Sequence, residues 1–576
     1  MKDKKGFTLV ELLAVVAILA LLVIISLPNI MAMFMDAKKN SFLTECKQIF
    51  KTAQQQWMKD SMFETKDQVY TRCKTCTEKT LSLSGRKEID YYINLNKAGK
   101  VVSFQATDGT FQFIYVGDEL KIEDITDAID VASLPDDEKI TIKDTGGVIE
   151  KEFYVSSTGS DSAIGDKDNP FLTLSQAFNK LENKVGTIYI MSDMRLPDTQ
   201  YVINNNITIM SADNNQYTLS PESASEFSTV LDFTRGVGSV SKVTLQNLIV
   251  DGNGIRGIRS NGTDLNLTNV DIKNGHLSDY SGICFKVTNA KVVLNNTNIN
   301  NCTGAVGGAI ELYNSTMTMN GGSVNNSGGR INEACAMNFK NSNVTFNSTT
   351  FDGNKSDNSM AFASVDTNSV VKFNNVNATN TTSRLGGMSI SGKVEINNSK
   401  FDHFVENDSY GRGSVAIVNS GGKLTINGST FSNCESNYGM INISDNTVVN
   451  IGGSNFNRNK ANYGGALYIG PNSDVTISNS TFKNNLASTR YGGAGGAIAS
   501  GGFLKLNNCT IENNKADKVV TTSTTSGGGL SISNGTTIVK GGSIINNIAD
   551  QGSDVYVDSA GSLINNGANI GSCSGC

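Results

Sequence analysis

Glu11 is the side chain near the start of the chain that is best placed to do chemistry. A Lys-Lys-Gly sequence at residues 4–6 precedes it, and the run from Leu12 to Met35 that follows it carries no charge. At about 1.5 Å per residue, a helix over this run is long enough to cross a bilayer. A lone carboxylate in such a helix costs about 2.5–3.5 kcal/mol on insertion scales and normally marks a function.

The sequence Lys-Gly-Phe-Thr-Leu-Val-Glu at residues 5–11, followed by an apolar helix, resembles the type IV prepilin signature that secretion pseudopilins share. The resemblance implies that a prepilin peptidase and methylase cuts after Gly6 and methylates the new N-terminal Phe7. It also implies that Glu11 meets the N-terminal amine of a neighbouring subunit and that Pro28 kinks the helix. The alternative is a plain single-pass anchor with an incidental glutamate.

The segment before the apolar run sets the predicted location. No small-x-small cleavage site follows the run, as a secretory signal would need. The lysines favour an orientation that leaves everything after the helix outside the cytoplasm. We therefore expect a single-pass protein of the cell membrane that later reaches the cell surface or a pilus through contacts with other pilin subunits.

The whole composition limits the function classes. The 576 residues have a net charge of −6, and no basic stripe follows the N-terminal lysines, which argues against a nucleic-acid partner. The chain has 57 glycines and 6 prolines, yet regularly spaced Val, Ile, Leu and Phe favour a repetitive β structure over disorder.

Ten cysteines are moderate for an exported chain. Cys73 with Cys76, and Cys573 with Cys576, form Cys-x-x-Cys pairs far apart in the sequence. Zinc would need both pairs close in space, and a redox site would need a βαβ context that is missing. We favour local structural disulfides, for example Cys46 with Cys73 or Cys76, over metal binding or redox use, and predict no metal and no cofactor.

The expected fold class is a long N-terminal α-helix with a small α+β pilin-like domain, then an all-β right-handed parallel β-helix. The domains are predicted at 1–6 (leader), 7–60 (membrane and filament-core helix), 61–145 (pilin-like domain with an acidic linker) and 150–576 (β-helix). After the membrane run, one apolar helix face consists of Phe42, Cys46, Ile49, Phe50, Ala53 and Trp57. Alternating runs at 88–95, 101–104 and 110–116 predict an antiparallel meander on that face.

A nine-residue pattern, such as Lys-Leu-Thr-Ile-Asn-Gly-Ser-Thr-Phe at 423–431, recurs from residue 242 onward. Its second and fourth residues should point inward, and its ninth begins the next inward strand. Copies begin at Lys242, Asp264, Lys291, Thr316, Asn343, Val370, Lys393, Lys423, Val448, Asp474, Phe503 and Thr536. Each copy predicts one coil of a solenoid.

The segment before these copies places Phe-Tyr-Val at 153–155 ahead of helix-spaced Leu174, Ala177, Phe178 and Leu181. This order resembles the opening of pectate-lyase-like β-helices, in which a short helix covers the first coil. Such a cap is needed because a coil end exposes apolar core and unpaired strand edges.

Asparagines that recur in phase predict an amide ladder inside the solenoid. They are Asn354, Asn459, Asn485, Asn514 and Asn547. Cys302 and Cys434 share that phase, which favours small stacked side chains over nucleophiles.

Catalysis finds little support in the sequence. Related galacturonases carry Gly-His-Gly and Asp-Asp motifs, whereas this chain has Asn-Gly-His-Leu at 274–277 and no Asp-Asp pair within the repeats. Two-carboxylate glycosidases need acids about 5–10 Å apart. Scattered acids would have to converge to meet that need, and we predict no catalytic residue; these acids are Asp251, Asp271, Asp352, Asp402 and Asp408.

Binding is the use that the sequence favours. Tyr438 and Tyr463 fall at equal offsets from Phe431 and Phe456, and Tyr491 takes the corresponding place after an insertion. Aromatic rings in a row can stack against sugars, although tyrosines that pack on one another across coils are the simpler interpretation. This flank, or the loops around Arg412 and Arg490, is the candidate contact for a surface glycan or protein.

We therefore predict a minor, tip-proximal type IV pilin-like subunit that displays a β-helix adhesion domain and is not an enzyme. The alternatives are a pseudopilin of a type II-like secretion system and a membrane-tethered polysaccharide lyase or hydrolase.

N-terminal sequencing of the protein recovered from the cell surface tests the leader. We expect the mature chain to begin at a methylated Phe7, because cleavage after Gly6 frees the amine that Glu11 needs. An intact Met1 would remove the assembly hypothesis.

Overall fold

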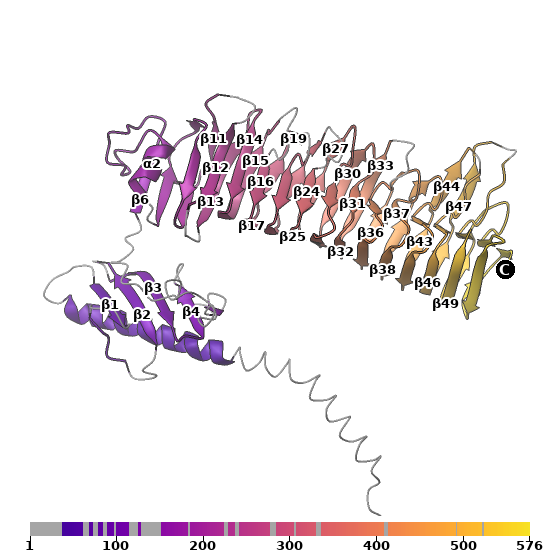
Figure 1. Ribbon diagram of the computed structural model, residues 1–576, viewed down its shortest axis with the longest axis horizontal. Coiled ribbons are helices and arrows are strands. Elements are labelled where there is room, and N and C mark those ends of the chain that lie inside the picture. Colours follow the sequence, from indigo (N-terminus) through magenta and orange to yellow (C-terminus); the bar gives the residue numbers. More distant parts are fainter. Residues whose placement is uncertain are drawn as a thin grey trace, which may run out of the picture. The chain divides into compact units, whose positions relative to one another are not determined.

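The computed structural model describes residues 37–61, 68–72, 79–83, 89–96, 99–114, 125–127, 151–181, 185–223, 228–236, 241–276, 284–304, 307–329, 336–407, 413–490, 492–520 and 523–576. The chain divides into two compact units, Met1–Glu150 and Lys151–Cys576 (Figure 1). The predicted leader and assembly residues Gly6, Phe7, Glu11 and Pro28 lie outside the described residues, as do Cys73 and Cys76.

The first unit contains an α-helix over residues 37–60 and a five-stranded antiparallel sheet in the order β1-β2-β3-β4-β5. The strands are β1 (Gln68–Arg72), β2 (Asp90–Leu95), β3 (Val101–Thr107), β4 (Phe111–Ile114) and β5 (Ile125–Asp127). Phe42, Cys46, Ile49 and Ala53 are buried against this sheet, so the predicted apolar helix face is confirmed. The predicted meander is also confirmed, while its likeness to a pilin head stays a prediction.

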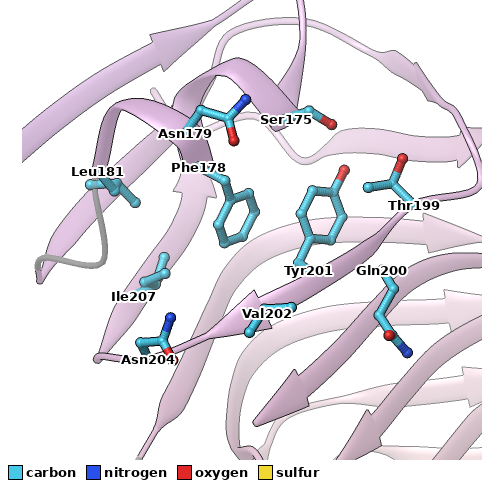
Figure 2. Close-up of a pocket in the computed structure, with 10 residues that line it drawn as sticks. All are labelled: Ser175, Phe178, Asn179, Leu181, Thr199, Gln200, Tyr201, Val202, Asn204 and Ile207. Atoms are coloured by element: carbon cyan, nitrogen blue, oxygen red, sulfur yellow. The ribbon is translucent and has the colours of Figure 1, made fainter. Parts of the chain in front are cut away.

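The second unit opens with the predicted cap. After β6 (Lys151–Val155), the helix α2 (Leu174–Leu181) buries Leu174, Ala177 and Leu181 in the solenoid core. The ring of Phe178 stacks on Tyr201 at a centroid distance of 4.4 Å (Figure 2). The helix therefore covers the end of the core that the first coil would otherwise expose.

The remainder of this unit is a right-handed parallel β-solenoid, in which strands of successive turns pair in parallel (Figure 1). Its 28-stranded sheet consists of β6, β7 (Gly186–Ile190), β8 (Met194–Leu196), β10 (Ile207–Ser211), β11 (Tyr217–Pro221), β13 (Lys242–Asp251), β15 (Asp264–Lys273), β17 (Lys291–Asn295), β18 (Asn298–Asn300), β21 (Thr316–Asn320), β22 (Ser323–Asn325), β25 (Asn343–Asn347), β26 (Thr350–Asp352), β27 (Lys355–Ser356), β29 (Val370–Asn374), β30 (Asn377–Ser383), β32 (Lys393–Asn397), β33 (Lys400–Glu406), β35 (Lys423–Asn427), β36 (Thr430–Ser432), β38 (Val448–Gly452), β39 (Asn455–Asn457), β42 (Asp474–Ser478), β43 (Thr481–Lys483), β46 (Phe503–Glu512), β49 (Gly535–Ile545), β51 (Gly561–Asn566) and β52 (Asn569–Ile570).

A second sheet lies on the other side of the coil and has 15 strands. They are β9 (Gln200–Ile203), β12 (Thr229–Arg235), β14 (Arg256–Asn261), β16 (Phe285–Thr288), β20 (Ile310–Tyr313), β24 (Met337–Lys340), β28 (Ala363–Val365), β31 (Met388–Ile390), β34 (Ala416–Val418), β37 (Ile441–Ile443), β41 (Leu467–Ile469), β45 (Ile498–Ser500), β48 (Leu530–Ile532), β50 (Val555–Val557) and β53 (Cys573–Ser574). Two small sheets pair β19 (Thr303–Gly304) with β23 (Gly328–Gly329), and β40 (Lys460–Ala461) with β44 (Leu486–Thr489) and β47 (Lys515–Lys518).

The repeat pattern explains these strands. In β35, Leu424 and Ile426 are buried and Lys423 is exposed, and Phe431 of β36 is buried as its ninth position requires. The chain turns between the two strands at Gly428, whose φ of 58° is strained for most other residues. The predicted inward and outward positions are therefore confirmed.

The predicted amide ladder also forms. In this ladder each side-chain Nδ2 donates to the side-chain Oδ1 of the next asparagine at 2.9–3.0 Å. The bonds run from Asn459 to Asn485, from Asn485 to Asn514 and from Asn514 to Asn547. The ladder ends on the buried carboxylate of Asp554, which accepts from the Asn547 side chain at 2.9 Å. Asn354 lies in the same phase but bonds to main-chain atoms of Ser327 and Val324.

The cysteines differ partly from the prediction. Cys302 forms a disulfide with Cys284, the residue before β16, instead of remaining a stacked thiol, and the Cα atoms of the two residues lie 5.8 Å apart. Cys573 is bonded to Cys576. The pairing proposed for Cys46 is wrong in this structure: its thiol is free and buried in the apolar core of the first unit, where burial raises its pKa. Cys434 keeps the predicted stacked position and donates its main-chain N–H to Asn459.

The amide ladder predicts a large stability difference between two asparagine substitutions. We expect Asn485→Ala to lower the free energy of unfolding by about 3 kcal/mol, since it leaves buried main-chain groups of Phe456 and Asn459 without partners. The matched control is Asn427→Ala, which removes one exposed side-chain bond to Asn397 and should cost less than about 1 kcal/mol. Urea unfolding measures both, and equal losses would contradict a structural role for the buried ladder.

Candidate functional site

The outer face of the 15-stranded sheet carries one continuous column of side chains. Because paired residues of parallel strands lie in register, equivalent positions stack from turn to turn. The column runs through Asp232, Arg259, Lys286, Glu311, Asn338, Ser364, Ser389, Ile417, Asn442 and Tyr468. This stretch of the column starts with four charged residues and continues through uncharged ones to the ring of Tyr468. In register, Gln200 precedes the stretch, and Ala499, Ser531 and Tyr556 follow it.

The charged residues Asp232, Arg259, Lys286 and Glu311, which we call the charged cluster, are paired along the column. Arg259 Nε donates to Asp232 at 2.9 Å, and Lys286 Nζ lies 3.0 Å from a Glu311 carboxylate oxygen. The Glu311 side chain is fully buried although it lies on the outer face, whereas 38% of Arg259 and 24% of Lys286 are exposed. A buried carboxylate needs partners, and Lys286 supplies one for Glu311.

Tyr313 completes the environment of Glu311. Its hydroxyl donates to the other carboxylate oxygen at 2.8 Å, and the ammonium groups of Lys286 and Lys340 each lie 5.4 Å from its ring centre. Burial and the neighbouring carboxylate raise the pKa of Tyr313. Burial and the adjacent Arg259 lower the pKa of Arg256, the first residue of β14.

These contacts define what the charged cluster can do. A phenol with a raised pKa is a poor general base at neutral pH. Asp232 and Glu311 lie three strands apart, about 14 Å at the spacing of paired strands, which exceeds the distance between the two acids of a glycosidase. The exposed parts of Arg259 and Lys286 are instead suited to contact acidic or hydroxyl groups of a ligand.

Further along the column, Tyr468 contacts Tyr438, which in turn contacts Tyr463; we call these three residues the tyrosine cluster. Tyr438 lies 5.4 Å from Tyr463 and 5.1 Å from Tyr468 between ring centres, and all three rings are half-buried. Burial, together with Tyr438 and Asp445, raises the pKa of Tyr468. Tyr438 and Tyr463 therefore pack on each other while keeping exposed surface; their use in binding stays a prediction.

The third tyrosine predicted for this flank, Tyr491, is not the residue in register with Tyr463. The residue in register with Tyr463 is Ala494, because the insertion before it is longer than the sequence offset assumed for Tyr491. Tyr491 itself lies outside the described residues, as do Arg412 and Asp408. Arg490 is described and exposed. Tyr468 was missed because it lies on a strand, where a tyrosine resembles any other outward residue.

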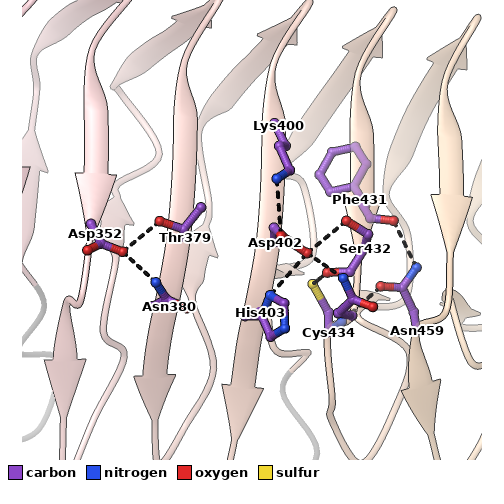
Figure 3. Close-up of polar contacts among 11 residues, drawn as sticks. Asp352, Thr379, Asn380, Lys400, Asp402, His403, Phe431, Ser432, Cys434 and Asn459 are labelled. Atoms are coloured by element: carbon purple, nitrogen blue, oxygen red, sulfur yellow. Dashed lines mark hydrogen bonds and ion pairs between the residues drawn. The ribbon is translucent and has the colours of Figure 1, made fainter.

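Each of the scattered acids that the structure describes is engaged by its own partners. Asp352 accepts from Thr379 at 2.6 Å and from Asn380 at 2.7 Å, whereas Asp402 accepts from Ser432 and Asn433 (Figure 3). Lys400 and His403 also lie within 3.2 Å of Asp402. Figure 3 shows the two carboxylates on strands separated by β30, each pointing to its own partners.

The remaining candidates are also engaged locally. Asp251 accepts from Asn274, and Asp271 accepts from Asn298. The ring of His276 lies 2.7 Å from the Thr303 hydroxyl, while His403 is far along the solenoid. In the described part of the chain, no group of three or more His, Cys, Asp or Glu is arranged to hold a metal ion.

Residues 1–27 match the sequence model of the prokaryotic N-terminal methylation motif. This match confirms the prepilin signature. The motif implies processing by a prepilin peptidase and assembly with other pilins. The motif suggests a membrane-anchored surface protein. The described residues include no helix that is long and apolar enough to span a membrane. No curated protein matches the chain.

Solved structures similar to this chain are distant. Tailspike protein 3 of bacteriophage CBA120 has 11% identity and a TM-score of 0.27, covering 73% of this chain and 62% of the tailspike. A rhamnogalacturonan lyase has 15% identity and a TM-score of 0.23, covering 58% of this chain and 82% of the lyase. A lacto-N-biosidase from Eubacterium ramulus has 10% identity and a TM-score of 0.19, covering 73% of this chain and 67% of the lacto-N-biosidase. Scores this low carry no argument about function.

The environment of Asp402 predicts that part of the free energy of unfolding depends on pH in the acid range. Burial alone would raise its pKa, but hydrogen bonds from Asn433 and Ser432 and the ammonium of Lys400 lower it from 3.8 to about 2. The stabilisation is therefore present above the unfolded-state pKa and lost as the pH falls toward 2. We expect Asp402→Asn to cost about 2 kcal/mol at pH 7 and almost nothing at pH 2.

Unfolding experiments at several pH values measure this difference. Asp357→Asn is the control, because Asp357 is 72% exposed and its ion pair with Lys355 contributes little. A cost for Asp402→Asn that does not change with pH would refute the assignment.

Proposed function

We propose that this chain is a minor, tip-proximal subunit of a type IV pilin-like filament that displays its solenoid as a binding domain. The methylation motif at residues 1–27 supports assembly through the N-terminal helix. The observation that carries the binding role is the outward column, which joins the charged cluster to the tyrosine cluster on one face.

The size of the solenoid supports a minor position in the filament. Lys151–Cys576 forms one compact unit, and a domain this large on every subunit would crowd a helical array. Because Glu11 is present, the subunit is also able to pack beneath another subunit in the filament. The same bulk counts against a pseudopilin, which is the alternative within this family of assemblies.

The face that we assign to binding suits an elongated glycan. Register-paired strands repeat at about 4.8 Å, so a polymer lying along the column meets polar side chains at regular intervals. Exposed ring surface at the tyrosine cluster stacks on sugar faces, and Arg259 with Lys286 contacts acidic or hydroxyl groups at the other end.

A membrane-tethered polysaccharide-cleaving enzyme is the second candidate. It is favoured by one observation, the buried Glu311 held between Lys286 and Tyr313, since buried charged groups concentrate at functional sites. Product release from the same glycans that are used to measure binding would favour this candidate.

A glycan-array experiment on sheared filaments tests the binding role. We expect filaments that contain the unsubstituted protein to retain acidic polysaccharides. The Tyr438→Ala/Tyr468→Ala variant should bind them with about tenfold lower affinity, because the exposed ring surface is removed. Tyr217→Ala is the control, since Tyr217 lies on β11 of the other sheet.

Two results would oppose the proposal. Unchanged retention by the tyrosine variant, with circular dichroism like that of the parent, would remove this face from the binding role. Gold labelling of the solenoid in the same filaments should mark their ends; label along the whole shaft would contradict a tip-proximal subunit.

A further inference from the structure

A cavity lies under the cap, at the start of the solenoid, and its lining residue Gln200 donates to Asp232 of the charged cluster at 3.3 Å. It has a volume of about 360 Å³ and is lined by α2, β9 and the turns beside them. Figure 2 shows its lining residues, which are Ser175, Phe178, Asn179, Leu181, Thr199, Gln200, Tyr201, Val202, Asn204 and Ile207.

The lining has no ionic side chain and consists of an apolar part and a polar part. Phe178 supplies half-buried ring surface and rests on Tyr201, while Leu181 and Ile207 extend the apolar part. Amide and hydroxyl groups occupy the rest of the wall, with Asn179 exposed at its edge.

Tyr201 is the observation that points to a ligand. The residue is only 4% exposed, and its hydroxyl faces Ser175 without forming a hydrogen bond of good geometry with any described residue. Figure 2 shows this hydroxyl pointing toward the part of the wall that contains Ser175 and Thr199. A buried hydroxyl without a good partner costs stability, and a ligand hydroxyl that takes the place of the Ser175 side chain would offset that cost.

We propose that this cavity binds a single neutral pyranose ring. A pyranose has an apolar C–H face, which fits against Phe178, and a rim of hydroxyls, which fits the amides and Tyr201. The volume lies at the lower end of the usual range for ligand pockets, which favours one ring over an extended chain. The absence of charged side chains among the lining residues favours a neutral sugar over a uronic acid.

Val202 provides a way to close the cavity without disturbing the fold. Its side chain is 56% exposed on β9, so a larger residue there fills the cavity mouth from the solvent side. Val448 of β38 is a matched control, because it is 46% exposed on a strand far along the solenoid and does not line the cavity.

Saturation-transfer NMR on the full chain in detergent tests the proposal. The probes are the methyl glycosides of glucose, galactose and N-acetylglucosamine, with methyl glucuronate as the charged comparison. We expect transfer to at least one neutral glycoside and none to the glucuronate. Val202→Trp should abolish the transfer, Phe178→Leu should weaken binding about tenfold, and Val448→Trp should match the parent.

Several outcomes would overturn the assignment. These are no transfer to any of the three neutral glycosides, equal transfer to the glucuronate, or unchanged transfer in a Val202→Trp variant whose circular dichroism matches the parent. The Tyr438→Ala/Tyr468→Ala variant keeps the cavity intact and should bind the neutral probe normally. Failure of the filament-binding proposal and failure of this one are therefore distinguishable.

Discussion

In-register stacking of parallel strands is the constraint on which the rest of this solenoid depends. Each turn contacts only its neighbours, so its inward residues must match those above and below. Leu424 and Ile426 show this for the apolar core, and Phe431, Phe456 and Phe482 show it for aromatic rings, whose centres follow one another at 5.2 and 4.5 Å. The amide ladder that ends at Asp554 satisfies the polar groups that the tight turns bring inside.

The same stacking determines what the outer surface can offer. A residue type placed at one outward position becomes part of a column, so neighbouring turns create a surface that no single turn contains. Arg259 and Lys286 are far apart in the sequence yet adjacent in register. The column also limits chemistry, because acids on different turns are held at multiples of the strand spacing. Asp352 and Asp402 lie two strand spacings apart, and each is satisfied by its own neighbours.

The two halves of the chain serve different purposes in our interpretation. The methylation motif at residues 1–27 gives the chain a means of assembly, while the solenoid provides rigid surface. A rigid solenoid suits binding because its side chains are positioned by the strands beneath them, which reduces the entropy lost when a ligand is held. The cap cavity differs from the column in being concave and in having no charged side chain in its lining, so the two sites would recognise different chemical groups.

Sequence periodicity was sufficient to predict the elements whose positions depend on local alternation and on stacking. These include the helix face around Ile49, the antiparallel meander, the repeat strands and the ladder of Asn459, Asn485, Asn514 and Asn547. Each follows from a pattern that a regular repeat turns directly into neighbouring positions in space.

The charged cluster, the Cys284–Cys302 disulfide and the cap cavity could not be predicted in this way. The strands of the 15-stranded sheet are short, and the segments before them vary in length, so sequence offsets do not identify their register. Ala494 shows the consequence, since it takes the place that counting residues had given to Tyr491. The sequence by itself determined the N-terminal motif and the solenoid, because both depend on the spacing of residues that lie close together in the sequence. Only the tertiary structure decided which side chains from neighbouring turns meet, because that depends on the lengths of the turns between strands.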